Sequence, residues 1–372
     1  MVDIIKKDYS IKKGNSIRME IDKNIQIESK QESEQESIFS REQRQENLIP
    51  EELKQETLEQ RKISKETNFQ VRFSVLNFTL FMLEDVVLPE RKEVVLRGGI
   101  GDMLLKQYCV RNADCASCDF ICSCLVQNFM YAKYKKKPKF VTTGESIGYV
   151  LSAEERKTHY REGDYLHFSL TLFGDVIAYL NPVVQTVYLL GQYGIGESRA
   201  RYQIEKIQNR YGNDILNNNS IYYKNYLIEL LSDYIEERKQ QLKKNHLETN
   251  YRIFFNSPLS IKYQGEFIRK FDIRAILNGI TRRIYMLECF EGRECTEKKF
   301  LENFPIILKQ NIRVFDAQKY SSRTKQYMPL KGISGEIVLD HIEEEMLEYL
   351  LAGEITHIGK NTRLGFGKYR IK

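Results

Sequence analysis

The sequence lacks any apolar run near the roughly 20 residues that a membrane-spanning helix requires. Its first residues, MVDIIKKDYS, also lack the apolar core of a secretory signal peptide. We therefore expect a soluble cytoplasmic protein, in which the seven cysteines stay reduced or bind a metal ion instead of forming structural disulfides. The 372 residues are enough for two or three domains, which excludes a peptide hormone or a disulfide mini-protein.

Acidic residues are in excess only at the start of the chain. Residues 1–66 contain 13 Lys and Arg against 15 Asp and Glu, whereas the remaining residues contain 44 against 36. The early segment has few aromatic residues and little apolar periodicity, so we expect it to be disordered or partly helical. The basic remainder is compatible with a polyanionic partner such as RNA, although many ordinary enzymes are equally basic.

Strand and helix patterns follow the same order twice along the basic part. Alternating apolar residues from Phe69 to Val75 indicate a strand, and Phe271-Asp272 ahead of a regular apolar stripe indicates a capped helix. Each half ends in a glycine-rich loop before its last strand, as in a split βαβ unit. We therefore predict an α+β fold of two tandem ferredoxin-like (RRM-like) domains. The expected parts are a polar extension over 1–66, a first domain over 67–207, a connector with a helix over 208–250 and a second domain over 251–372.

Two local interpretations follow from composition within these parts. The apolar stretch from Val176 to Leu190 is too long for one strand and predicts a helix, which Gly174-Asp175 can introduce. The segment YGNDILNNNS, residues 211–220, has the composition of a loop.

The cysteine cluster has the sharpest chemical spacing in the sequence. Five of the seven cysteines lie between positions 109 and 124, and Cys115 and Cys118 form a C-x2-C pair that can grip one ion from a single turn. Cys109 and Cys124 can complete a tetrahedral set of four thiolates, which favours a structural zinc ion. The alternative is a group of thiols that bind no metal, since there is no second C-x2-C pair.

A glycine-rich, cationic segment lies near the end of the chain. Gly359, Gly365 and Gly367 allow the backbone to approach a ligand closely, and Lys360, Arg363 and Lys368 supply positive charge. This combination suits contact with RNA phosphates. A tight turn before an edge strand is the alternative interpretation.

A second polar segment, KYSSRTKQ, contains Tyr320, Arg323 and Lys325 ahead of the strand pattern GISGEIVL. A cluster of an aromatic ring and two cations can stack a base or hold a phosphate. The same residues can equally form a solvated loop.

With this segment the chain resembles the Cas6 family of CRISPR-associated precursor-RNA endoribonucleases, of the RAMP superfamily, in the branch with a cysteine cluster. The resemblance covers roughly residues 72 to 371. It rests on eight stretches in order: LRGGIGDMLLKQYC, the run of Cys115, Cys118 and Cys124, LTLFGDV, GQYGIGESRARYQI, FFNSPLSIKY, RRIYMLE, KYSSRTKQYMPLKGISGEI and HIGKNTRLGFGKYRI. It implies two RRM-like domains, binding of CRISPR repeat RNA and metal-independent cleavage within the repeat. The family glycine pattern has a further glycine where this chain has His357.

The resemblance directs the choice of site residues. Metal-free cleavage needs a base for the 2′-hydroxyl, an acid for the leaving 5′-oxygen and a cation for the charged phosphorane, and histidine suits the first two roles. Of the five histidines, His357 stands in the cationic loop expected to meet phosphate, so we predict His357, Lys360 and Tyr320 as catalytic. The expected RNA contacts are Arg199, Arg323, Lys325, Gly359, Arg363, Gly365, Gly367 and Lys368. If His357 fails, His159 and His167 are the next candidates.

Three functions remain open at this level. The chain can be a repeat-specific endoribonuclease that needs no metal for catalysis. It can instead be an inactive RNA-binding subunit of a CRISPR effector or adaptation complex, or a zinc-stabilised scaffold with an incidental basic face. RNA binding without cleavage would indicate the second function, and the absence of salt-sensitive RNA binding would indicate the third. No membrane partner is expected.

Overall fold

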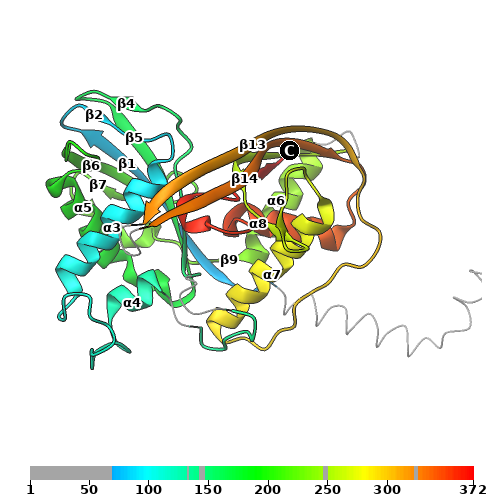
Figure 1. Ribbon diagram of the computed structural model, residues 1–372, viewed down its shortest axis with the longest axis horizontal. Coiled ribbons are helices and arrows are strands. Elements are labelled where there is room, and N and C mark those ends of the chain that lie inside the picture. The colour runs from blue at the N-terminus through cyan, green and yellow to red at the C-terminus, as the bar shows by residue number, and fades with distance from the viewer. Residues whose placement is uncertain (1–68, 132–133, 142–146, 246–249, 322–325) are drawn as a thin grey trace, which may run out of the picture. The chain divides into compact units, whose positions relative to one another are not determined.

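The computed structural model describes residues 69–131, 134–141, 147–245, 250–321 and 326–372. The predicted disorder of residues 1–66 lies outside these residues. The described part, Phe69–Lys372, is one compact unit that contains two main sheets, each with its own helices, and two short two-stranded sheets (Figure 1). Among the described residues, no helix is both long enough and apolar enough to cross a membrane.

The first domain has the order βαββαβ. Its main strands are β1 (Arg72–Met82), β3 (Tyr149–Ser152), β5 (Tyr165–Phe173) and β6 (Tyr202–Gln208), and its main helices are α3 (Lys92–Tyr108) and α5 (Leu180–Tyr193). The strands lie side by side in the order β3-β5-β1-β6, and all of these pairs are antiparallel. This is the topology of a ferredoxin-like domain.

Smaller elements extend this domain. The short strand β2 (Val86–Val87) pairs with β4 (His159–Tyr160), and β9 (Glu229–Leu230) pairs with β1. The other small elements are α4 (Leu125–Met130), η1 (Gly174–Tyr179), β7 (Asp214–Asn217), β8 (Ser220–Ile221) and η2 (Tyr223–Asn225). The helix predicted over 176–190 therefore divides in two. Its α-helical part begins at Leu180, with Pro182 in the first turn, where a missing N–H costs no helical hydrogen bond.

The prediction of a loop over residues 211–220 is wrong in part. Residues Asp214–Asn217 and Ser220–Ile221 form the hairpin β7–β8, which adds two strands beside β6. The turn consists of Asn218 and Asn219, with φ angles of 47° and 58°. Two central residues with positive φ favour a tight hairpin turn, and asparagine tolerates that conformation, so the asparagine-rich composition makes a turn within a sheet.

The second domain repeats the βαββαβ order. Its strands are β10 (Tyr251–Leu259), β13 (Ile307–Ser321), β14 (Gln326–Leu339) and β15 (Arg370–Ile371), and its helices are α7 (Ile273–Glu291) and α8 (Glu344–Thr356). They form an antiparallel sheet in the order β13-β14-β10-β15. Short elements are β11 (Lys262–Tyr263), β12 (Glu266–Phe267) and η3 (Thr362–Leu364), and the connector contains α6 (Leu231–Asn245). The predicted fold of two tandem ferredoxin-like domains is confirmed.

The predicted start of α7 is also confirmed. Asp272 is the N-cap, and its Oδ1 accepts a hydrogen bond from the backbone N–H of Ala275 at 3.0 Å. The apolar stripe of the helix packs into the core, where Ile276, Leu277 and Ile280 have no exposed surface. An N-cap aspartate satisfies one of the free donors at the start of a helix.

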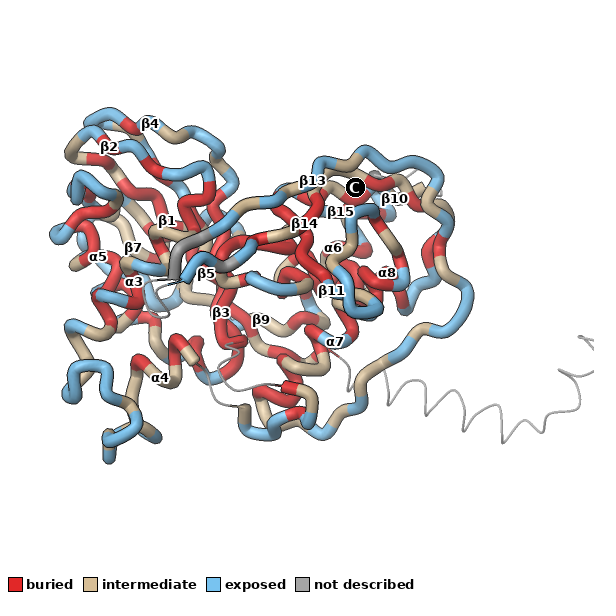
Figure 2. Tube along the Cα trace, viewed as in Figure 1, coloured by how far each residue is buried: buried red, intermediate tan, exposed pale blue. Residues whose placement is uncertain are grey.

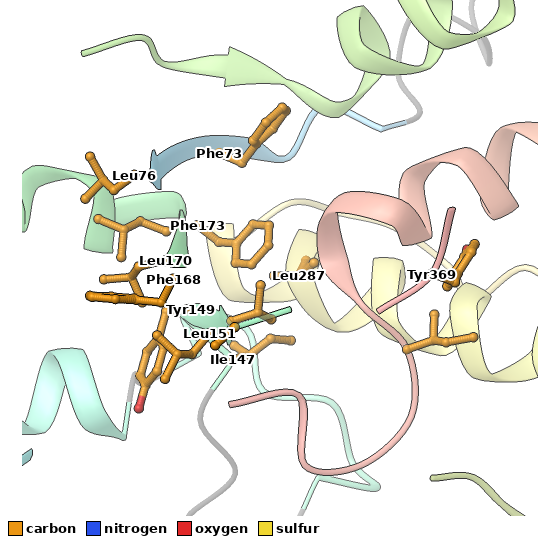
Figure 3. Packing of buried hydrophobic residues seen from close by; sticks show 14 of the residues in the cluster. Phe73, Leu76, Ile147, Tyr149, Leu151, Phe168, Leu170, Phe173, Leu287 and Tyr369 are labelled. Atoms are coloured by element: carbon orange, nitrogen blue, oxygen red, sulfur yellow. The ribbon is translucent and has the colours of Figure 1, made fainter. Parts of the chain in front are cut away.

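One continuous core joins the two domains. Phe73 of β1 and Phe173 of β5 belong to the same buried cluster as Leu287 of α7 (Figure 3). Buried residues follow the sheets and the inner sides of the helices, whereas most of β13 is exposed or half-buried (Figure 2). Elements of both domains therefore share one core.

Candidate nucleic-acid interface

The glycine-rich loop between α8 and β15 uses its backbone donors within the protein. The N–H of Ile358 donates to Gly367 O at 3.1 Å, and the N–H of Gly367 donates to Pro258 O at 2.9 Å. The N–H of Lys360 donates to Ser260 O at 2.7 Å. These three donors are therefore committed to fixing the loop.

The same loop packs against the first domain. A Cβ atom at Gly365 would lie 2.1 Å from Oε1 of Glu93, so the close approach that glycine permits here is to a buried carboxyl of α3. Arg363 donates to Met130 O at 3.0 Å. Lys368 donates to Ser152 Oγ at 3.0 Å and forms an ion pair with Glu154 at 2.6 Å. The loop thus connects the two domains.

His357 ends helix α8 in a buried position with 3% of its surface exposed. Burial, followed by the positive charges of Lys368 and Arg283, lowers the pKa of His357 well below the ordinary value of about 6.5. Its Nδ1 has no hydrogen-bond partner among the described residues. A neutral imidazole enclosed in this way cannot reach an RNA phosphate in this structure, so the geometry does not support the predicted acid–base role.

The other predicted site residues are only partly brought together. Lys360 is exposed beside the loop, and Gly359 is half-buried. Tyr320 lies opposite Tyr327 near the end of the β13–β14 hairpin, while Arg323 and Lys325 lie outside the described residues.

Arg199 is an exposed residue of the turn between α5 and β6, where its φ is 55°. The backbone of this turn is held by the N–H of Arg199, which donates to Gly196 O at 3.4 Å. No hydrogen bond or ion pair described for the chain joins Arg199 to the glycine-rich loop.

The predicted zinc ligands are not assembled into a metal site. Across the residues that the structure describes, no group of three or more His, Cys, Asp or Glu side chains is placed to hold a metal ion. Cys109 and Cys115 instead accept hydrogen bonds, the first from the N–H of Ala113 at 3.2 Å and the second from Gln127 Nε2 at 2.8 Å. The four thiols do not fit a zinc ion in this arrangement, so zinc stays a prediction.

A cationic surface covers the side of the second sheet that faces away from its helices. Ile253 and Phe255 of β10 are buried, so the alternating residues Arg252, Phe254 and Asn256 lie on the opposite side. The strand register adds further members to this surface, the second-sheet face: Lys309, Asn311, Arg313, Ser334, Glu336, Val338, Arg370 and Lys372. The second-sheet face therefore carries five cations and one carboxylate, and one of the cations, Arg370, also pairs with Glu354 at 3.4 Å.

Phe254 lies near the middle of the second-sheet face. The ammonium of Lys372 lies 5.1 Å from the centre of its ring, and the guanidinium of Arg252 lies 5.9 Å from it. Arg370 is directly opposite Phe254 in the register of β10 and β15. An aromatic ring between cations is a suitable surface for single-stranded nucleic acid.

The corresponding side of the first sheet carries aromatic and polar groups. This first-sheet face consists of Asn77, Thr79, Phe81, Ser152, Tyr165, His167 and Ser169, which share one side through the register of β1, β3 and β5. Tyr165 is 45% exposed, and its ring stacks at 6.3 Å from that of the exposed His167. Nδ1 of His167 lies 3.2 Å from Thr79 Oγ1, a hydrogen bond that orients the ring.

Side chains at the domain boundary link the two domains next to these faces. Lys368 reaches Ser152 of the first-sheet face, and Arg156 donates to the backbone oxygen of Asn256 on the second-sheet face at 2.7 Å. Sequence reasoning missed this surface, because period-2 alternation shows that a strand has two sides but not which strands align. The signals were present in the alternating residues of RIFFNS and YLHFS.

Comparisons with known proteins agree with this architecture. Residues 253–369 match the family model of the CRISPR-associated endoribonuclease Cas6, and residues 70–230 match a model described as an N-terminal domain. No curated protein sequence matches the chain.

Solved structures with a similar fold include a chain of a partial Cas6-RT-Cas1-Cas2 complex, with a TM-score of 0.51 and 14% identity over 82% of this chain and 46% of that chain. A chain of a Cas6-RT-Cas1-Cas2 complex has the same TM-score and identity over 82% of this chain and 29% of that chain. This chain therefore spans less than half the length of either. Thermus thermophilus Cas6 gives a TM-score of 0.43 and 12% identity over 81% of this chain and 99% of that one.

At these identities the solved structures bear on the fold alone, and the likeness to the two chains with a TM-score of 0.51 agrees with the fold described above. The family model adds the assignment of the second domain and its glycine-rich loop. The predicted resemblance to the Cas6 family is confirmed, because residues 253–369 match the model of that family.

Proposed function

We propose that this protein binds CRISPR repeat RNA and cleaves precursor crRNA within the repeat, without a metal ion. The observation that carries the proposal is the pair of sheet faces, which is cationic on the second sheet and aromatic on the first. Lys368 of the glycine-rich loop donates a hydrogen bond to Ser152 of the first-sheet face and so links the two domains there. Such a surface offers phosphate contacts and base stacking to a single strand, whereas duplex recognition relies on groove shape. The Cas6 family model over residues 253–369 supports the same substrate class.

The chemistry proposed is attack of a ribose 2′-oxygen on the adjacent phosphorus, with loss of the 5′-oxygen. Because His357 is buried, His167 is the better candidate for the acid or base. It is exposed on the first-sheet face, and Thr79 holds one ring nitrogen while the other is left for substrate. A positioned acid or base contributes roughly 10² to 10⁴ in rate. Lys360, the exposed cation of the loop, is proposed to offset the charge of the phosphorane.

The test is single-turnover cleavage of the repeat RNA encoded beside the gene, in EDTA. The proposal expects products with a 2′,3′-cyclic phosphate and a 5′-hydroxyl. His167→Ala should slow cleavage by about 10² or more with RNA affinity changed only a few-fold. His341→Ala is the matched control, because His341 is also exposed but lies after the end of β14. A strict Mg²⁺ requirement with 5′-phosphate products would contradict the mechanism.

The second candidate function is RNA binding without cleavage, as a subunit of a larger CRISPR assembly. The burial of His357, the histidine of the glycine-rich loop, is the observation that favours it. Two of the similar solved chains belong to complexes named with reverse transcriptase, Cas1 and Cas2, so adaptation proteins are proposed as partners. Salt-sensitive binding of repeat RNA with no cleavage under any metal condition would select this function.

A further inference from the structure

Two thiols outside the cysteine cluster face each other at the end of α7. Cys289 lies in the last turn of the helix and Cys295 follows its end, and their sulfur atoms are 3.8 Å apart. Gly292 reverses the chain with a φ of 83°, and its N–H donates to Cys289 O at 3.1 Å. The helix end therefore folds back so that residues six positions apart come into contact.

A small oxidant can reach this pair. Both thiols line a cavity of about 280 Å³ whose other walls are Lys136, Lys137, Pro138, Tyr285, Arg293 and Glu294. Cys295 is half-buried, whereas Cys289 is 5% exposed. The first attack on an oxidant is therefore expected at Cys295, with Cys289 held behind it.

We propose that Cys289 and Cys295 are a reversible redox modification site, which forms a disulfide on reaction with hydrogen peroxide. The Cys295 sulfur attacks one peroxide oxygen, the O–O bond breaks, and the departing oxygen is protonated to water. The Cys289 sulfur then loses its proton and attacks the resulting sulfenic acid, the S–O bond breaks, and a second water leaves. The two thiols lose two electrons, and one peroxide is reduced to two waters.

The local environment makes this a slow reaction. Burial, followed by the negative charge of Glu288, raises the pKa of the Cys295 thiol, so little thiolate is present at neutral pH. Formation of the disulfide consequently depends on sustained exposure to the oxidant. The disulfide would therefore form under prolonged oxidative conditions and not under brief ones.

The disulfide would stabilise the contacts between the end of α7 and the start of β1. Glu288 accepts the N–H of Phe69 at 3.3 Å, Glu291 accepts the N–H of Arg72 at 2.7 Å, and Arg293 donates to Gln70 O at 2.7 Å. Glu291 and Arg293 lie within the turn that the Cys289–Cys295 bond would close, and Glu288 directly precedes it. Oxidation is therefore expected to fix the start of β1 to the end of α7.

The experiment treats the full chain with millimolar peroxide, blocks free thiols with an alkylating agent and digests with trypsin without reduction. Cleavage after Arg293 places Cys289 in IYMLECFEGR and Cys295 in ECTEK. The expected product is this pair of peptides joined by one disulfide, which a dithiol reductant separates. The oxidised protein should also melt a few degrees higher, and Cys295→Ser should show no such shift.

The cysteines between positions 109 and 124 are an internal comparison in the same digest. Recovery of both Cys289 and Cys295 as alkylated thiols after those cysteines have been oxidised would overturn the proposal. Recovery of Cys295 as sulfinic or sulfonic acid with Cys289 still free would do the same. The peptide map of the wild-type protein decides the matter even if the serine variant folds poorly.

Discussion

Arg238 of α6 and Glu354 of α8 form an ion pair in the core, with 2.8 Å between Nε and Oε2. Both side chains are almost fully buried, and Glu354 also accepts hydrogen bonds from Tyr234 at 2.6 Å and from the N–H of Ile371 at 2.7 Å. One carboxylate therefore holds the connector helix, α8 and the last strand together. A buried charge that loses its partner is costly, because no solvent replaces the lost interaction.

Glu354→Ala should accordingly reduce the free energy of unfolding by about 3–5 kcal/mol. The control is Glu345→Ala on the same helix, because Glu345 pairs with Lys298 at 2.6 Å but is 47% exposed. Exposed pairs contribute about 1 kcal/mol or less. Urea unfolding of both variants measures the difference, and equal losses would contradict the role assigned to Glu354.

Gly365→Ala should destabilise the protein by about 2–4 kcal/mol, since a side chain would strain a residue with a φ of 77° and overlap the Glu93 carboxyl. Gly98→Ala is the opposite case. Gly98 lies inside α3, and a Cβ there would meet nothing within 4 Å, so the change should stabilise the helix by up to about 1 kcal/mol. Thermal unfolding compares the two variants. A neutral Gly365→Ala would show that the loop does not need its close approach to the first domain.

His357 makes stability depend on pH. The unfolded chain binds a proton at His357 near pH 6.5, but burial keeps the folded pKa well below that value. The unfolded state therefore binds more protons as the pH falls, and the free energy of unfolding should drop below pH 6.5 by up to about 1.4 kcal/mol per pH unit. His357→Asn removes this titration and tolerates the φ of 53°. Unfolding curves between pH 5 and 8 should differ in slope between the two proteins, and parallel curves would refute the interpretation.

Lys360→Ala and Arg252→Ala should each weaken binding of repeat RNA several-fold. Each change removes one phosphate contact, so the slope of log K against log salt should become shallower by about 0.7 to 0.9. Lys243→Ala is the control, because Lys243 is an exposed cation of α6 that belongs to neither sheet face. Titrations at several salt concentrations measure the slopes. An equal effect of all three changes would indicate that only net charge matters.

The zinc prediction is open to a direct measurement. Elemental analysis should find about one zinc per chain, and Cys115→Ser should lose it whereas Cys289→Ser should not. Because the described thiols are not gathered around a common point, binding would require residues 109–124 to rearrange. Zinc-free wild-type protein of full stability would refute the prediction.

Local patterns and tertiary contacts differ in how well the sequence predicts them. The cap at Asp272 and the apolar stripe of α7 depend on residues a few positions apart, so their spacing was sufficient. The burial of His357 could not be predicted, because groups near it, such as Arg283 and Arg91, are distant in the sequence. The sequence makes His167 only a later candidate after His357, and only the register of β1 with β5 shows that it lies on an open face next to Tyr165.

The contacts of the glycine-rich loop also determine whether each domain is stable when the chain is cut between them. A chain cut after residue 250 would keep every strand of the first sheet but lose Arg363 and Lys368, and the apposition of Gly365 to Glu93 would be replaced by solvent. The isolated second domain would leave the same loop without its support. Two repeats of one fold are thus expected to act thermodynamically as a single body, because the unfolding of either repeat removes the surface that stabilises the other.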